Sequence, residues 1–162
     1  MRVTKEGRIF VEKELKTHLN KYGHWKTKTQ FNPEQYFGFI YLITNKLSGM
    51  WYIGKKQLKL KNKYKVNQKG NKKKKKTKIV YVESGWESYT SSSFYVNEDI
   101  KKFGISNFSF EIISLHKSKS SLYYQEVHEL VTRGALVNRV ASGERVSYNR
   151  AIPGVKFIPL VD

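Results

Sequence analysis

The chain has 162 residues, no cysteine and a formal net charge of +18 at pH 7. This length suits one domain with a real core, and the lack of cysteine excludes disulfide frameworks and thiolate metal sites. No apolar run approaches the roughly 20 residues of a membrane span, and the N-terminus lacks the apolar segment of a secretory signal, so we expect a cytoplasmic protein with no membrane partner.

The positive charge is concentrated in about one third of the chain. No Asp or Glu occurs between Gln35 and Val82, whereas fourteen lysines lie from Lys46 to Lys78. A concentrated positive field indicates a polyanionic partner. Nucleic acid fits better than an anionic membrane surface, because the basic stretch is not an amphipathic helix.

Residues 1–35 are predicted to form an N-terminal helical extension that packs against the main domain. Val11, Leu15 and Leu19 recur at helical spacing within residues 7–22. No function follows from this segment.

The stretch Tyr36–Lys56 has the pattern of a β-hairpin. Apolar and aromatic residues alternate up to a turn rich in Asn, Ser and Gly at residues 45–49, and a second short run follows from Met50. The hairpin would place Tyr41 and Tyr52 on neighbouring strands. Taken alone, the pattern also fits two core tyrosines.

Residues 55–78 are dominated by lysine and are predicted to form a mobile loop or a frayed hairpin tip. The five consecutive lysines from Lys72 to Lys76 repel one another. A solubilising surface loop and a localisation-type basic patch both fit this composition. We favour an arm that binds phosphates, because the segment directly follows the strand that carries Tyr52.

The second half of the chain alternates between strands and helices. The patterns predict a short strand at residues 79–82, a polar loop at 85–93 in which a serine near the end can cap the next helix, a helix at 94–103 ended by Gly104, a strand at 108–115 and a helix at 118–133.

Glu126 lies on the apolar stripe of the last predicted helix. Leu122, Glu126 and Leu130 are each four residues apart, so the carboxylate falls on or beside the buried face. A buried carboxylate is costly unless it is paired or bound to a metal. An ion pair with a nearby lysine, an edge position that reaches solvent and a metal site are all consistent with this spacing. His128 has no His or Cys at ligand spacing and is interpreted as a surface residue.

The predicted hairpin contains two short strings, Gly38-Phe39-Ile40-Tyr41 and Tyr52-Ile53-Gly54. They resemble the two motifs of the GIY-YIG nucleases, and the first string has one residue more than GIY. Further landmarks of the family follow in the same order, and they are the serines at 91–93, the helix ended by Gly104, Glu126 and Asn149. The amino-acid sequence of these segments is most similar to that of phage-encoded members of the family that are related to homing endonucleases.

This resemblance implies an α/β (α+β) fold with a small, mainly antiparallel three-stranded sheet flanked by helices. The nuclease-like domain would span residues 36–150, with the lysine-rich insert at 55–78 and a C-terminal tail at 151–162. The implied activity is metal-dependent hydrolysis of phosphodiester bonds in DNA, most naturally double-stranded, with Mg²⁺ or Mn²⁺ as the cofactor.

The resemblance also implies roles for individual residues. Glu126 would bind the metal, Tyr41 would act as a base or position the water, and Tyr52 would orient water or phosphate. Because the free pKa of tyrosine is about 10, nearby lysines would have to favour the Tyr41 phenolate. Lys55 would neutralise the phosphate, and Asn149 would hold the last strand. The expected DNA-binding residues are Lys56, Lys72, Lys73, Lys74, Lys75, Lys76, Lys78, Ser92 and Ser93.

The sequence departs from the family in one respect. The family places an arginine soon after the second motif, whereas this chain has no arginine between Arg8 and Arg133. Either Lys55 supplies the charge or catalysis is impaired, since lysine cannot form the bidentate contact that arginine makes with phosphate. A basic DNA- or RNA-binding protein with a decayed site, and a structural protein of ribosomal type, are the alternatives. The oligomeric state and the recognition sequence stay open.

Overall fold

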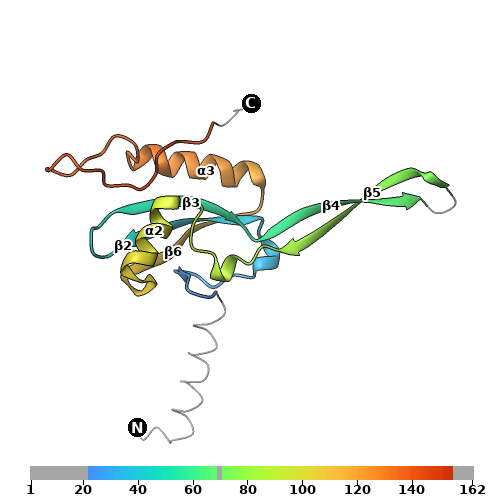
Figure 1. The fold of residues 1–162 in the computed structure, drawn as a ribbon, viewed down its shortest axis with the longest axis horizontal. Coiled ribbons are helices and arrows are strands. Elements are labelled where there is room, and N and C mark those ends of the chain that lie inside the picture. The colour runs from blue at the N-terminus through green and yellow to red at the C-terminus, as the bar shows by residue number, and fades with distance from the viewer. Residues whose placement is uncertain (1–21, 69–70, 155–162) are drawn as a thin grey trace, which may run out of the picture.

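The computed structural model describes residues 22–68 and 71–154, so the helix predicted at residues 7–22 lies almost entirely outside the described residues. The elements, in chain order, are β1 (Lys26–Thr27), η1 (Pro33–Gln35), β2 (Gly38–Asn45), β3 (Trp51–Gln57), β4 (Lys59–Gln68), β5 (Asn71–Glu83), η2 (Trp86–Ser88), α2 (Phe94–Phe103), η3 (Ile105–Asn107), β6 (Phe108–His116) and α3 (Lys119–Thr132) (Figure 1).

The main sheet has the strand order β1-β6-β2-β3. The central strand β2 pairs antiparallel with both β6 and β3, which confirms the expected three-stranded antiparallel arrangement, and the two-residue strand β1 adds a parallel edge beside β6. Two residues are too few to show an alternating pattern, so β1 has no signal in the sequence. In the β2–β3 hairpin Tyr41 lies opposite Gly54, and Ile43 lies opposite Tyr52.

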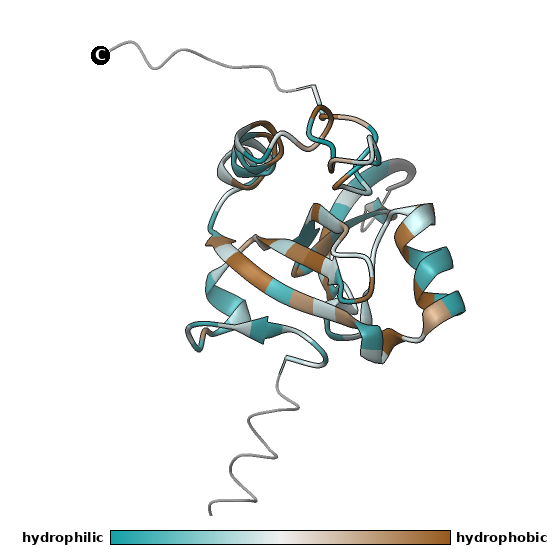
Figure 2. Cartoon of the chain, turned by 90° about the vertical axis from the view of Figure 1, so that its left-hand side faces the viewer, coloured by the Kyte–Doolittle hydropathy of each residue, from teal (hydrophilic) through white to brown (hydrophobic). Residues whose placement is uncertain are grey.

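Helices α2 and α3 cover opposite faces of the sheet (Figures 1 and 2). Alternation along β2 turns Phe39, Tyr41 and Ile43 toward the α2 side and Ile40 toward the α3 side. On the α3 side, Ile40 packs with Ile53, Leu122 and Leu130 in a smaller aliphatic cluster.

An aromatic cluster fills the α2 side, and residues 22–35 contribute to it. Trp25 packs edge-on against Phe39 with ring centroids 5.3 Å apart, and its indole N–H donates to the Trp86 carbonyl at 2.7 Å. The segment before β2 therefore belongs to the same core as the strands.

Strands β4 and β5 form a two-stranded antiparallel ribbon that projects away from the main sheet (Figure 1). The sequence predicts a mobile loop or a frayed hairpin tip over 55–78. The structure instead continues antiparallel pairing from Lys59 opposite Glu83 to Asn67 opposite Lys75. Cross-strand backbone hydrogen bonds and side chains that alternate between two faces compensate for the repulsion between lysines.

The helix boundaries follow the predicted signals closely. The Ser93 hydroxyl accepts from the Val96 N–H at 3.4 Å and caps α2, and Gly104 ends this helix with a φ of 85°. Ser118 caps α3 in the same way, by accepting from Ser121. No helix in the described ranges is long and apolar enough to cross a membrane.

Candidate active site

The segment that follows α3 covers only the first half of the outer edge of β3. The Trp51 N–H donates to the Val146 carbonyl at 3.1 Å, and the Tyr148 N–H donates to the Trp51 carbonyl at 2.8 Å. Beyond Ile53, no backbone of the described chain pairs with this edge at Gly54. The open half of the edge begins at the glycine of the second motif.

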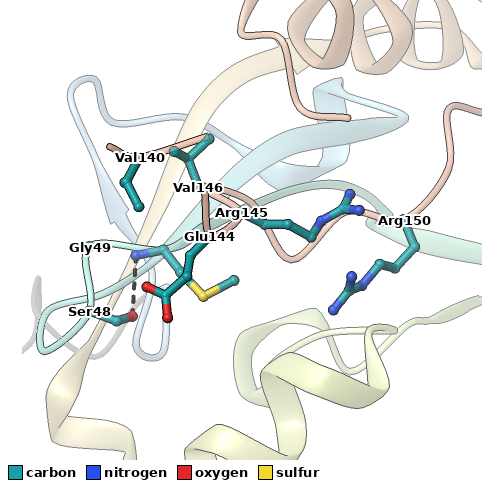
Figure 3. Close-up of a pocket in the computed structure, with 8 residues that line it drawn as sticks. Ser48, Gly49, Val140, Glu144, Arg145, Val146 and Arg150 are labelled. Carbon is teal, nitrogen blue, oxygen red and sulfur yellow. Dashed lines mark hydrogen bonds between the residues drawn. The ribbon is translucent and has the colours of Figure 1, made fainter. Parts of the chain in front are cut away.

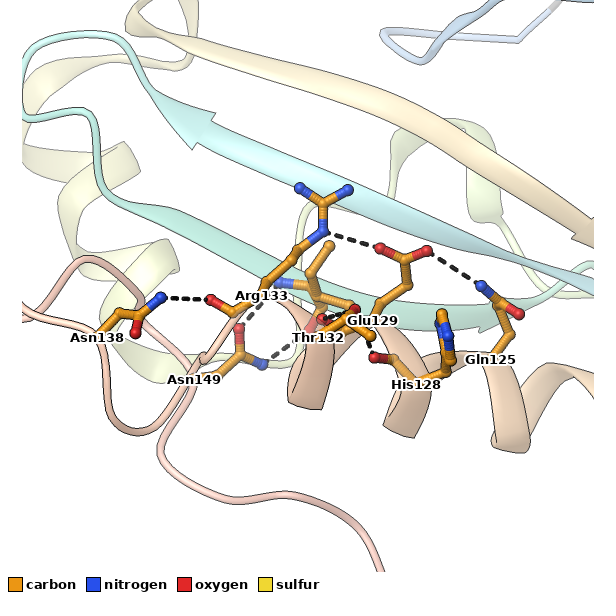
Figure 4. A network of polar contacts seen from close by, with 8 residues as sticks. Gln125, His128, Glu129, Thr132, Arg133, Asn138 and Asn149 are labelled. Atoms are coloured by element: carbon orange, nitrogen blue, oxygen red, sulfur yellow. Dashed lines mark hydrogen bonds and ion pairs between the residues drawn. The ribbon is translucent and has the colours of Figure 1, made fainter.

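Asn149 makes the last contacts between the C-terminal segment and the covered half of the β3 edge. Its side-chain amide donates to the Ile53 carbonyl at 2.8 Å, and its Oδ1 accepts from the Ile53 N–H at 2.9 Å (Figure 4). The Ser147 hydroxyl donates to the same Oδ1 at 3.0 Å. These bonds use the buried amide of Asn149 to hold the β3 backbone next to Gly54.

Tyr41 packs against Gly54 on the α2 side of the sheet. A Cβ atom on Gly54 would lie 2.4 Å from the Tyr41 hydroxyl oxygen and 2.9 Å from Cε1 of Tyr52, so only glycine leaves room for both rings. Beside Tyr41 the register of β6 shifts, with Ile112 opposite Tyr41 and Ser114 opposite the preceding residue. Such bulges are common next to active sites.

The Tyr41 hydroxyl is fully buried and close to Tyr89 and Ser91, yet it completes no hydrogen bond of normal geometry with any described residue. Burial, and then the neighbouring Tyr52 and Tyr89, raise the pKa of Tyr41 well above its ordinary value. The expectation that lysines favour the Tyr41 phenolate is therefore wrong. The phenol is neutral at physiological pH.

Tyr52 is more accessible than Tyr41 and packs beside it on the α2 side of the sheet. Its hydroxyl is 3.2 Å from the hydroxyl of Ser92, which precedes α2 in the chain. Burial raises the pKa of Tyr52, and the hydrogen bond with Ser92 partly opposes that rise. The charge of Glu126 adds to it, so the carboxylate lies within electrostatic range of this phenol.

Glu126 and Lys55 form an ion pair on the α3 side of the edge. Glu126 is 7% exposed between Leu122 and Leu130, and its Oε2 accepts from the Lys55 ammonium. The Lys55 ammonium also lies 4.2 Å from the centroid of the Tyr123 ring. Among the alternatives that the sequence leaves open for a buried carboxylate, the structure therefore contains the lysine pair.

The surroundings of Glu126 fit a hydrated magnesium ion better than a caged metal. No described group of three or more His, Cys, Asp or Glu side chains could hold an ion. Mg²⁺ keeps several waters and is commonly bound by one or two carboxylates together with substrate phosphates. The Oε1 atom of Glu126 accepts no hydrogen bond from the described residues and is available to such an ion.

The second carboxylate on this part of α3, Glu129, is already engaged (Figure 4). It accepts from Arg133 at 2.8 Å and from Gln125 at 3.0 Å. Burial alone would raise the pKa of Glu129, but these two hydrogen bonds outweigh it and lower the pKa below its ordinary value. Glu126 is therefore the better candidate for a metal ligand.

Lys55 and Lys56 extend to opposite faces of the sheet because they are consecutive in β3. The Lys56 ammonium lies 3.9 Å from the centroid of the Tyr89 ring, and burial lowers the pKa of Lys56. Tyr89 also packs edge-on against Tyr41. Tyr89 belongs to this site but is not among the predicted site residues. The only signal for it in the sequence is an aromatic residue within a polar loop, three residues after Trp86.

The structure brings only part of the predicted set together. Seven of the predicted residues surround the edge of β3, and they are Tyr41, Tyr52, Lys55, Lys56, Ser92, Glu126 and Asn149. The Ser93 hydroxyl serves as a helix cap. Lys75, Lys76 and Lys78 are exposed on the projecting ribbon, and the side chains of Lys72, Lys73 and Lys74 lie outside the described ones.

Two arginines of the C-terminal segment line a separate hollow of about 590 Å³ (Figure 3). Arg145 and Arg150 border it together with Gly49 of the β2–β3 turn, and the Arg150 guanidinium lies 4.5 Å from the centroid of the Tyr95 ring. This turn precedes β3, whereas Lys55 lies near the other end of the strand. The hollow therefore does not place an arginine beside Lys55.

A family model described as "Putative endonuclease segE, GIY-YIG domain" matches residues 22–152, which is most of the chain. The chain belongs to the GIY-YIG endonuclease family. No curated protein and no solved structure gives a significant match. The matched range of this GIY-YIG domain includes Trp25 and extends past Asn149, in agreement with the part these residues play in the core and at the edge of β3.

Proposed function

We propose that the chain is a divalent-cation-dependent endonuclease that hydrolyses phosphodiester bonds of double-stranded DNA at the open edge of β3. The observation that carries this proposal is the pairing of Lys55 with Glu126 where the C-terminal segment stops covering the strand, with Tyr52 within electrostatic range of the carboxylate. Family membership supports an endonuclease, and the net charge of +18 supports DNA as the substrate.

Glu126 would hold Mg²⁺ or Mn²⁺ through its free oxygen. A cation bound there would stabilise the negative charge that develops on the phosphate. Lys55 would leave the carboxylate for a phosphate oxygen as the substrate arrives, and it would then supply part of the charge that arginine supplies elsewhere in the family.

Tyr52 and Tyr41 would act as neutral phenols. A neutral phenol donates one hydrogen bond and accepts another, so Tyr52 can orient either the attacking water or the phosphate from its position beside Ser92. Tyr41 would pack against Gly54 and so hold the ring of Tyr52 in position. Asn149 would keep the backbone of the β3 edge in place.

A second candidate function is DNA binding with little or no cleavage. The ion pair between Lys55 and Glu126 favours it, because the pair engages both the candidate metal ligand and the candidate phosphate ligand. Lysine also lacks the bidentate geometry of arginine.

The basic insert and the segment from Trp86 to Ser93 resemble phage-type members of the family. We therefore infer a phage or mobile-element origin of the homing-endonuclease type.

Incubation of the purified protein with supercoiled plasmid separates the two candidate functions. With Mg²⁺ we expect nicked or linear product, and with excess chelator none. Glu126→Ala is expected to retain DNA binding and lose cleavage. Binding without cleavage in any divalent cation would support the non-catalytic alternative, and full activity in chelator would exclude the metal role of Glu126.

A further inference from the structure

The ribbon of β4 and β5 has the dimensions of an element that enters a DNA groove. The ten residues of β4 span about 33 Å at roughly 3.3 Å per residue, and the ribbon is only two strands wide. It projects from the domain with both broad faces exposed over most of its length (Figure 1). The major groove of B-DNA is about 12 Å wide and admits a two-stranded β-ribbon.

The antiparallel register sorts the side chains of the ribbon into two faces. We name as face A the face that presents Lys61, Lys63, Lys65, Asn67, Lys75, Thr77, Ile79 and Tyr81. The opposite face, face B, presents Asn62, Tyr64, Val66, Lys76, Lys78 and Val80. Among the described side chains, four lysines extend from face A, three of them in a row along β4, against two from face B.

Negative charge is confined to the base of the ribbon. Glu83, opposite Lys59, is its only carboxylate among the described residues, and the Lys59 ammonium is paired with Glu34 of the domain. The lysines from Lys61 outward have no described carboxylate partner. Their ammonium groups are therefore available to a ligand.

We propose that this ribbon lies in the major groove of duplex DNA and turns face A toward the base edges. The inference rests on the proposed function for its DNA substrate, and it adds that the ribbon reads bases besides gripping phosphates. Double-stranded RNA is a poor partner for the same face, since the major groove of A-form helices is too deep and narrow for side chains to read.

The chemistry of face A matches the acceptors and methyl groups of that groove. Lysine donates to O6 and N7 of guanine, and an amide such as that of Asn67 pairs with N6 and N7 of adenine. Thr77 and Ile79 can contact the methyl group of thymine. The three consecutive face A lysines of β4 therefore predict a preference for guanine on at least one strand.

Groove-specific base analogues test this assignment without cleavage. In the presence of a chelator, the protein is titrated with a guanine-rich duplex, with the same duplex carrying 7-deazaguanine, which lacks the major-groove N7, and with the same duplex carrying inosine, which lacks the minor-groove amino group. We expect the 7-deazaguanine duplex to bind about tenfold more weakly and the inosine duplex to bind like the parent.

Two double variants, each of which removes two positive charges, determine which face of the ribbon contacts the bases. Lys63→Gln/Lys65→Gln is expected to abolish the discrimination against 7-deazaguanine. Lys76→Gln/Lys78→Gln is expected to weaken binding to all duplexes alike and to keep the discrimination, because phosphate contacts carry no base information. Circular dichroism checks that both variants fold.

Each contrary outcome has a definite meaning. Equal affinity for all three duplexes, or weaker binding of the inosine duplex alone, overturns the major-groove assignment and leaves the nuclease proposal standing if plasmid is still cut. Loss of discrimination in the face B variant instead of the face A variant overturns the choice of face. Absence of any duplex binding overturns both the ribbon assignment and the proposed DNA substrate.

Discussion

Replacing Gly54 with alanine tests the packing that holds the two tyrosines at the edge of β3. The new Cβ would lie 2.4 Å from the Tyr41 hydroxyl oxygen and 2.5 Å from its Cζ, which is closer than real Cβ contacts. Tyr41 cannot easily retreat, because it is fully buried with Trp25 5.1 Å away between ring centroids and Tyr89 6.1 Å away. Overpacking of this kind typically costs 1–3 kcal/mol, and we expect about 2 kcal/mol here.

Urea denaturation measures that cost, and plasmid nicking measures its effect on the site. Gly49→Ala is the matched control, since a Cβ there meets nothing within 4 Å but φ is +73°, so strain alone should cost about 1 kcal/mol. We expect Gly54→Ala to lose nicking activity by at least tenfold, and Gly49→Ala to stay within about twofold of the parent under conditions where both are folded. An unchanged free energy of unfolding for Gly54→Ala would refute the packing of Tyr41 on Gly54.

Three further predictions concern the same site. Tyr41→Phe removes a buried hydroxyl without a described partner, so thermal denaturation should show equal or higher stability while nicking falls; lower stability would mean that the hydroxyl is satisfied in solution. Lys55→Met leaves the Glu126 carboxylate buried and unpaired, which should cost about 2–3 kcal/mol in urea, and adding Glu126→Gln should recover most of it; additive losses would contradict the ion pair. Because burial raises the pKa of Tyr41 and of Tyr52 in the folded state, the unfolded chain loses these protons first, and stability should fall as pH rises above about 10, by at most about 1.4 kcal/mol per pH unit for each tyrosine. Stability that stays flat in this range, or that falls equally in Tyr41→Phe/Tyr52→Phe, would argue against the raised values.

Periodicity explains why much of the fold could be predicted from the sequence. The alternation around Tyr41 fixes the face of β2, and the spacing of Leu122, Glu126 and Leu130 places the carboxylate on the buried stripe of α3. The serine and glycine at the ends of α2 mark its limits through local hydrogen bonds and backbone freedom. Signals of this kind depend only on neighbours in the chain.

The remaining features depend on contacts between distant segments. The pairing of Lys55 with Glu126 joins residues 71 positions apart, and Asn149 reaches Ile53 across 96 positions. The raised pKa of Tyr41 arises from burial by several elements, which no local pattern reports. In the ribbon, lysine repulsion suggests a loop, whereas the antiparallel ladder that overrides it becomes visible only when β5 is placed beside β4.

The most direct test of the central claim compares Glu126→Gln with Glu129→Gln in a single-turnover cleavage assay with Mg²⁺ on one DNA duplex. Both changes remove one charge from α3, but only Glu126 faces Lys55 at the open edge of β3, while Glu129 is held by Arg133 and Gln125. We predict that Glu126→Gln binds the duplex and fails to cut it, and that Glu129→Gln cuts at close to the parental rate. Parental cleavage by Glu126→Gln, or equal loss of cleavage in both variants while both remain folded, would contradict the assignment of the active site.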